Sequence, residues 1–329
     1  MADHHFVPQF YLRGFRDPLS LGAMPKDQWL WVADRARGEV KARAPRNVGA
    51  RTNYNALPEA QGHESAEQVL SQLESVAAPI IRSLNNGVSR LPGQERVDLL
   101  FFAAFLGVRT PFFRDQMEGF AAGILEDLLQ QTASHPEYYH AGVRATATVE
   151  LTDEEIEASR LRALTPGAFK IQVRPLLSLF AAFEGANRAV YPHFNAMRWA
   201  ILRTDPGLFF VTSDNPVSWA DMSPRPPFYE GHGLRMRNVE VVFPVGPEVC
   251  MLGTWNGPTG ALRAQKRLVD AINLRVARFA VSEIYAHREG LARHVMAEHR
   301  KRWVPAKQAE GSRRPRLPDD RDQEARGAT

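Results

Sequence analysis

The spacing of apolar side chains changes once along this chain, and that change restricts the folds that it can adopt. Between about residues 65 and 190, apolar residues recur every three or four positions, which is typical of helices with one buried face. From about residue 196 they alternate, as in Met197, Trp199 and Ile201, which is typical of strands. Two short strands, over 29–33 and 39–43, are expected before the helices. The order of strands, helices, strands and a helix favours an α+β fold over alternating βαβ units.

Local signals place the ends of several elements. Capping-box pairs open helices at Ser65 and Thr152, and the segment Arg109-Thr110-Pro111 interrupts a helix that begins near Gln94, because a residue before proline avoids the helical region. The other expected elements are an apolar helix over 171–190, strands over 208–212, 239–243 and 249–253, and a long helix over 261–289. We therefore expect one predominantly helical α+β domain over residues 1–303, with small antiparallel β elements. Residues 304–329 have almost nothing to bury and are expected to be a disordered tail.

Composition places the chain among ordinary globular proteins. Of its 329 residues 44% are hydrophobic and 24% charged, and 41 basic against 37 acidic side chains leave a formal charge of +4. The single cysteine, Cys250, excludes an intramolecular disulfide and a cysteine-based zinc cluster, and it fits a reducing compartment. No secretory signal is recognisable, and the longest apolar run, residues 99–108, is half of the roughly 20 residues that a bilayer span needs. We expect a cytoplasmic protein without a membrane partner.

The segment HHFVPQ at residues 4–9 is the first candidate for chemistry. Its two imidazoles offer ligands for a divalent metal, or a base that titrates near neutral pH. Adjacent side chains of a strand point to opposite faces, so one of His4 and His5 is expected in a site and the other against the fold. The alternative is a buried N-terminal strand in which both imidazoles are hydrogen-bonded.

The segment TSDNP at residues 212–216 is the second candidate. It directly follows an expected strand, where the carboxylate of Asp214 could bind Mg²⁺ or orient a water. The same letters also form a good turn, because Asp214 and Asn215 can bond their own backbone and Pro216 stops the strand. Taken alone, this segment favours the turn.

Arg109 is the third candidate, since a guanidinium at a helix break in an apolar context needs an anion or carbonyl oxygens. It could clamp a phosphate or carboxylate, or it could form a buried pair with Glu67, Glu74 or Asp115. Asn273 lies beside an apolar helical stripe, and we expect it to bond a loop at the edge of the core.

Positive charge is concentrated between residues 35 and 51, where six basic residues stand against Glu39 alone. Such a run can bind phosphates, but the solvated face of a hairpin is the more frequent interpretation. The six tryptophans, Trp255 among them, do not alternate with basic residues and are expected to serve packing and not base stacking. The chain has no GxGxxG, P-loop, GxSxG or HExxH motif, which argues against the enzyme classes that use them.

The opening at residues 4–13 and the SDNP segment resemble the signatures of a bacterial family called domain of unknown function 4238. The match continues in chain order and covers about residues 4–286; it takes in residues 30–34, 47–54, 109–111, 210–216, 243–244 and 272–273. One departure is Gly246-Pro247, where the family more often has a serine before the proline. The family has no established activity. The resemblance therefore implies a fold, and it implies that His4, His5, Arg109, Asp214 and Asn215 converge on one site.

Two functions of different classes are consistent with these residues. The first is a divalent-metal-dependent phosphoester hydrolase, favoured as a nuclease, in which His5 and Asp214 hold Mg²⁺, Mn²⁺ or Zn²⁺ and Arg109 stabilises charge on the phosphate. His5 could also act as general base, and His4, Gln9 and Asn215 would contact substrate. Its partner would be nucleic acid or another phosphate-bearing ligand. The alternative is a non-catalytic binding or sensing module of a toxin, defence or stress system. The sequence leaves the oligomeric state open.

Overall fold

Three β-sheets organise the computed structural model, which describes residues 3–52, 63–165, 167–168, 171, 182, 184–222 and 233–302. The largest has five strands in the order β10-β5-β9-β8-β7, the second has the order β3-β2-β11-β6, and β1 pairs with β4 alone. The strand bounds are β1 Asp3–His5, β2 Leu30–Asp34, β3 Glu39–Arg43, β4 Ala50–Thr52, β5 Arg198–Thr204, β6 Thr212–Ser213, β7 Ser218–Asp221, β8 Val239–Gly246, β9 Val249–Thr254, β10 Gly260–Ala264 and β11 Glu283–Ala286.

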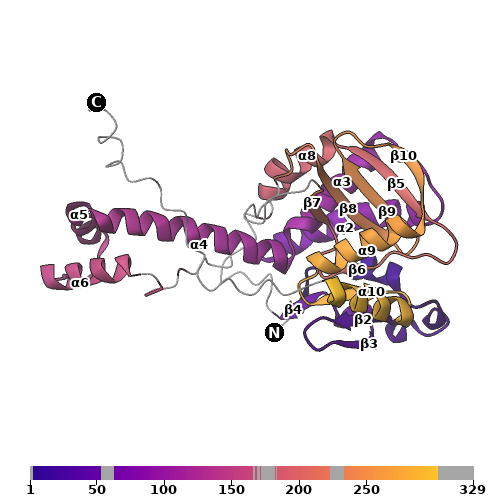
Figure 1. Cartoon of the computed structure of the whole chain (residues 1–329), viewed down its shortest axis with the longest axis horizontal. Coiled ribbons are helices and arrows are strands. Elements are labelled where there is room, and N and C mark those ends of the chain that lie inside the picture. The colour runs from indigo at the N-terminus through magenta and orange to yellow at the C-terminus, as the bar shows by residue number, and fades with distance from the viewer. Residues whose placement is uncertain are drawn as a thin grey trace, which may run out of the picture.

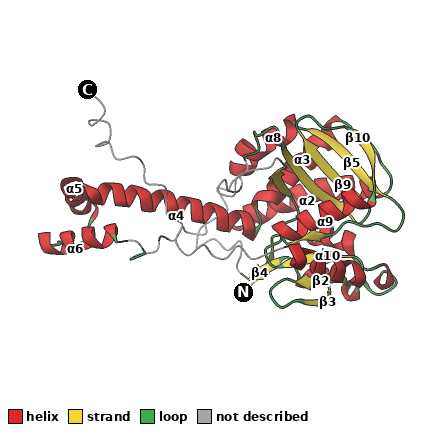
Figure 2. Cartoon of the chain, in the orientation of Figure 1, coloured by secondary structure: helices red, strands yellow, loops and turns green. Residues whose placement is uncertain are grey.

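Helices enclose the two larger sheets and also form an arm that leaves them (Figures 1 and 2). The arm consists of α4, with α5 and α6 packed at its far end. The helix bounds are α1 Gln9–Leu12, α2 His63–Asn85, α3 Gly93–Val108, α4 Pro111–Ser134, α5 Pro136–Thr146, α6 Asp153–Leu164, α8 Tyr191–Ala196, α9 Lys266–Phe279 and α10 Glu289–Arg302, with a π-helical turn over Gly185–Val190.

The five-stranded sheet is buried on both faces. Along β5, Trp199 and Ile201 join one cluster of buried apolar side chains, whereas Ala200 and Leu202 join a second cluster. α3 covers the first face and is apolar nearly all round, as expected for a helix with little exposed surface. α9 covers the second face, and its other neighbours are the four-stranded sheet and α10. The core therefore lies in two layers on either side of this sheet.

The expectation of a predominantly helical domain with small antiparallel β elements is wrong, although the α+β class holds. A sheet of five strands forms the centre of the fold, and β10 runs parallel to β5. The long helix expected over 261–289 is also wrong, because this segment contains β10, α9 and β11. Its ends are drawn into strands by partners far away in sequence, β5 for β10 and β2 for β11. The expected strand over 208–212 is reduced to β6.

Most expectations that rested on local signals are confirmed, but the helix start expected at Ser65 is wrong, because α2 already begins at His63. β2 and β3 form the expected hairpin, β8 and β9 pair antiparallel, and Thr152 and Glu155 make a reciprocal capping box. α3 ends at Val108, and the Thr110 side chain caps α4, so the break at 109–111 lies where expected. Most of the helix expected over 171–190, and the tail over 304–329, lie outside the described residues. Within those residues, no helix has the length and apolar character to cross a bilayer.

Gly107 allows α3 to lie close to the five-stranded sheet, and α3 carries Arg109 at its end. A Cβ atom at Gly107 would lie 2.9 Å from the ring of Trp219 in β7. We predict that Gly107→Ala destabilises the fold by about 1–3 kcal/mol, because the ring and the helix must move apart. Urea denaturation measures the change. Gly119→Ala in α4 is the matched control: a Cβ there meets nothing within 4 Å, so better helix propensity should stabilise by about 0.5–1 kcal/mol. Equal effects of the two substitutions would contradict the packing argument.

Candidate functional site

The HHFVPQ segment is fixed by backbone bonds on one side and by a short helix on the other. β1 pairs with β4 so that His5 lies opposite Ala50, and the N–H groups of Phe6 and Val7 both donate to the carbonyl oxygen of Gly49. Pro8 has extended backbone angles and precedes α1. His5 therefore stands where the strand ends and the helix begins, with its ring half-buried.

Gln9 is the nearest polar partner of the His5 ring. The amide nitrogen of Gln9 lies 2.9 Å from Nε2 of His5, and Arg13 donates to the amide oxygen of Gln9 at 3.4 Å. With the amide nitrogen as donor, Nε2 is the acceptor and the neutral ring carries its proton on Nδ1. His4 precedes His5 in the strand and is also half-buried.

Arg109 connects the His5 segment to α2. Its guanidinium donates to the backbone oxygen of His5, lies 3.4 Å from a carboxylate oxygen of Glu74, and stands 5.5 Å from the ring centre of Phe105. The side chain is 7% exposed, whereas Glu74 keeps about a third of its side-chain surface. Burial raises the pKa of Glu74, and the charge of Arg109 opposes that rise. The buried pair with Glu74, one of the two alternatives for Arg109, is thus present.

Asn215 reaches the same region through the residue after Arg109. The Thr110 hydroxyl donates to the side-chain oxygen of Asn215 at 3.2 Å, and the Asn215 amide nitrogen donates to the backbone oxygen of Phe279 at 3.1 Å. Asn215 is 3% exposed. Its amide therefore joins the start of α4 to the end of α9.

The carboxylate of Asp214 points to the turn between α9 and β11. One oxygen accepts the N–H of Val281 at 2.8 Å, and the other accepts those of Ser282 and Glu283 at 2.6 and 3.0 Å. The side chain is buried, and burial raises its pKa to about 6, while the three backbone N–H groups act in the opposite direction. Ser213, and not Asp214 or Asn215, makes the local turn bonds of this segment, because its hydroxyl exchanges bonds with the backbone of Asn215.

The predicted site residues are thus brought together in part. His5, Gln9 and Arg109 are in contact or joined by hydrogen bonds, and Asn215 is linked to them through Thr110. The carboxylate of Asp214 is directed elsewhere, toward 281–283. Because both of its oxygens accept backbone N–H groups and it is buried, Asp214 does not fit the role of a metal ligand. Within the described ranges, no three His, Cys, Asp or Glu side chains are grouped to share a metal ion.

Three polar residues near these motifs make contacts that the sequence does not indicate, namely Glu74, Thr110 and Tyr285. Glu74 is only one of several acidic candidates for pairing with Arg109, and no sequence pattern singles out the Thr110 hydroxyl. Tyr285 is buried in β11, donates to the Glu283 carboxylate at 2.7 Å, and has a pKa raised by burial. Because the sequence pattern predicts a helix over the residues of β11, the pairing of β11 with β6 could not be expected from the sequence. The position of Glu74, one helical turn after Leu70 on α2, is the signal in the sequence that could have indicated its place beside the core.

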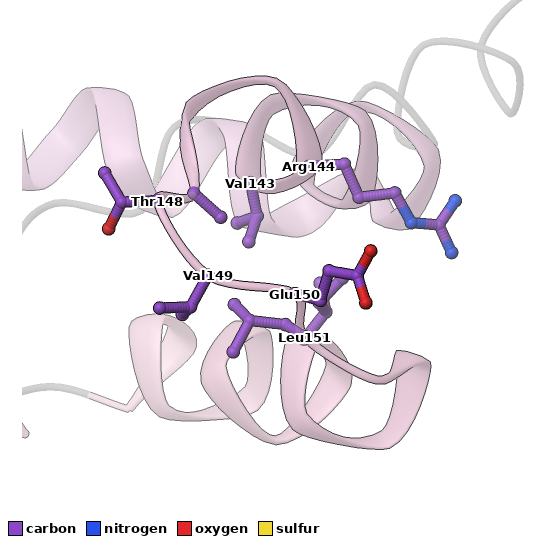
Figure 3. Close-up of a pocket in the computed structure, with 8 residues that line it drawn as sticks. Val143, Arg144, Thr148, Val149, Glu150 and Leu151 are labelled. Atoms are coloured by element: carbon purple, nitrogen blue, oxygen red, sulfur yellow. The ribbon is translucent and has the colours of Figure 1, made fainter.

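Other polar regions are separate from this cluster. In the basic hairpin, Arg37 pairs with Asp34 at 3.7 Å and Lys41 with Glu39 at 2.5 Å, as in a solvated hairpin face. Asn273 bonds the backbone of Phe209 and Val211, which confirms its expected structural role. The hollow in Figure 3 lies between α5 and α6 on the arm, where apolar and polar side chains are mixed and Arg144 is directed outward.

Comparison with known proteins assigns a family but no activity. A family model described as Protein of unknown function (DUF4238) matches residues 3–290, which confirms the resemblance drawn from the motifs. No curated protein matches the chain, and no solved structure matches it.

Removal of the Asp214 carboxylate tests its structural role. We predict that Asp214→Ala lowers the free energy of unfolding by about 3–5 kcal/mol, because three N–H groups in the turn lose their acceptor, at roughly 1–3 kcal/mol for each that stays unsatisfied. Asp214→Asn should cost less, since one oxygen remains. Urea denaturation followed by circular dichroism measures both. A loss below 1 kcal/mol for Asp214→Ala would sink this role.

The pH dependence of stability, compared between wild type and Asp214→Asn, gives a second test of the role of Asp214. The pKa of Asp214 is raised from 3.8 to about 6 in the folded chain, so the folded state binds this proton more tightly than the unfolded state. The resulting contribution to stability is complete below pH 3.8 and is lost as the pH rises through about 6. The stability advantage of wild type over Asp214→Asn is therefore expected to shrink between pH 4 and pH 7. A constant difference across that range would contradict the raised pKa.

Proposed function

The chain belongs to the family described as Protein of unknown function (DUF4238), and we propose that it hydrolyses phosphoesters, with nucleic acid as the favoured substrate class. The activity is assigned to the cytoplasm, in keeping with the single, buried Cys250. The site is the group formed by His5, Gln9, Glu74 and Arg109.

The observation that carries the proposal is the convergence of groups able to move protons around one buried cation. His5 and Glu74 lie at opposite ends of a 70-residue stretch and both are half-buried; the backbone oxygen of His5 and the carboxylate of Glu74 both contact the guanidinium of Arg109. A carboxyl group whose pKa is raised by burial, beside a fixed cation, is a frequent feature of active sites. Three different elements supply these side chains, namely β1, α2 and the end of α3.

In the proposed reaction a water oxygen attacks phosphorus while Nε2 of His5 takes a proton from that water. The bond from phosphorus to the leaving oxygen breaks, and the leaving oxygen receives a proton from solvent. In the structure the amide of Gln9 bonds to Nε2 of His5. The attacking water would therefore replace this amide at Nε2 when substrate binds. Arg109 acts as a positioning residue: it holds the His5 backbone and supplies positive potential below the phosphate.

A divalent ion, Mg²⁺, Mn²⁺ or Zn²⁺, belongs to this proposal with a changed set of ligands. Glu74 and a phosphate oxygen of the substrate would hold it in place of Asp214; Nε2 of His5 would join them only if solvent, and not His5, took the proton from the attacking water. Imidazole suits Zn²⁺, whereas carboxylate and phosphate oxygens suit Mg²⁺ and Mn²⁺. The ion would polarise the phosphate oxygen and lower the pKa of the attacking water.

The second candidate is a non-catalytic binding or sensing module of a toxin, defence or stress system. A specific observation favours it: the polar side-chain atoms of Asp214 and Asn215 already bond to backbone or to Thr110. Side chains whose hydrogen bonds are already made within the protein stabilise the local structure. Such a module would bind an anion or a protein tail, with no turnover and no metal requirement.

Cleavage assays separate the two candidates. The full chain is incubated with single- and double-stranded DNA, with RNA and with bis(p-nitrophenyl) phosphate, with each of the three metals or with EDTA. We expect metal-dependent cleavage that falls at least 100-fold in His5→Ala and in Glu74→Gln, because each loses a proton acceptor or metal ligand. The control is His140→Ala, a histidine of the arm that pairs with Glu157 at 3.1 Å and lies outside the site.

Each variant is first shown to be folded by circular dichroism and thermal melting. Absence of cleavage under every condition, with all variants folded, would replace the hydrolase by the binding module. Equal losses in His140→Ala and His5→Ala would also reject the proposed site.

A further inference from the structure

A second hollow, of about 490 Å³, lies beside α8 and is lined by His193, Arg235, Arg237, Trp255 and Asn256. These residues come from α8, from the segment that leads into β8, and from the loop after β9. No aspartate or glutamate is among them. The hollow shares no residue with the group around His5, so its role is independent of the proposed hydrolase.

The two arginines are placed here by the packing of their neighbours. Leu234 is buried and Met236 packs against the larger core cluster, whereas Arg235 and Arg237 are exposed. Two successive turns, Met236 N–H to Gly233 and Val239 N–H to Met236, hold this segment. Within the part of the chain that the structure describes, neither guanidinium has an ion-pair partner, and both belong to the lining of one hollow.

Trp255 gives this hollow a fixed aromatic wall. Its indole N–H donates to the backbone oxygen of Leu234 at 2.9 Å, which fixes the ring beside the arginine segment. The ring of His193 stands 6.2 Å away at an angle of 70°. The tryptophan side chain is half-buried and therefore keeps part of its surface open to a ligand.

We propose that this hollow binds a nucleotide, either free or as the phosphorylated end of a strand. Arginine pairs bind phosphate oxygens through charge-assisted hydrogen bonds, and an indole ring stacks on a nucleobase. The Asn256 amide and the His193 ring offer donors and acceptors to the base or ribose. An inorganic anion would use the arginines but not Trp255, and an apolar ligand would leave both guanidinium groups without a partner.

Calorimetric titration of the full chain tests the site, with AMP, adenosine, inorganic phosphate, 5′-phosphorylated pentaadenylate and the same oligomer without the phosphate as probes. We expect AMP to bind at least tenfold more tightly than adenosine or phosphate alone. Arg235→Gln, Arg237→Gln and Trp255→Leu should each weaken AMP binding at least tenfold. Arg278→Gln, an exposed arginine on α9, should leave it unchanged.

The outcomes are distinct. Tighter binding of the phosphorylated oligomer than of AMP identifies a strand end as the ligand, and equal or weaker binding identifies the free nucleotide. Binding of phosphate as tight as that of AMP, or AMP affinity unchanged in Trp255→Leu and in both arginine variants, would overturn the proposal. A failure of cleavage in the His5 assays has no bearing on these titrations.

Discussion

The burial of the Asp214 carboxylate against three backbone N–H groups is the constraint on which much of this fold depends. β6 has only two residues, so its pairing with β11 contributes few ladder bonds. The carboxylate supplies three further bonds to the turn over 281–283, where the end of α9 passes into β11. Buried N–H groups without an acceptor are costly, and Asp214 satisfies three of them where α9 passes into β11.

Arg109 plays a related part at the other side of the cluster. A buried cation needs a counter-charge or hydrogen-bond acceptors, and Arg109 has Glu74 of α2 and the backbone oxygen of His5 in β1 among its partners. The same helix break presents Thr110 to Asn215. One break between two helices thus orients the histidine and joins it to the SDNP segment. Structural and chemical roles therefore fall on the same few residues, which is why a stability readout has to accompany every activity readout here.

Features that depend on neighbouring residues could be predicted from the sequence, whereas strands whose pairing partners lie far away along the chain could not. The capping box at Thr152 and the helix break before Pro111 depend on residues within one turn of each other, and both are confirmed. β10 and β11 depend on partners that lie between about 60 and 250 residues away, so their local pattern suggested one long helix. In the site, the family resemblance implied that His5 and Arg109 lie together, and the backbone oxygen of His5 does accept a bond from Arg109. The partners of Asp214 are backbone groups, which leave no mark in the sequence.

Charge density along the sequence is likewise a poor guide to charge in the folded molecule. The run over 35–51 is the most basic stretch before the tail, yet Arg37 and Lys41 are paired with carboxylates of their own hairpin. Arg235 and Arg237 are only two residues, but the fold places them beside Trp255, and no acid is among the described residues that line the hollow. An anion responds to the uncompensated charge within a few ångströms, because water and salt screen the rest. Arg235 and Arg237 near α8 therefore attract an anion more strongly than the basic run over 35–51 does.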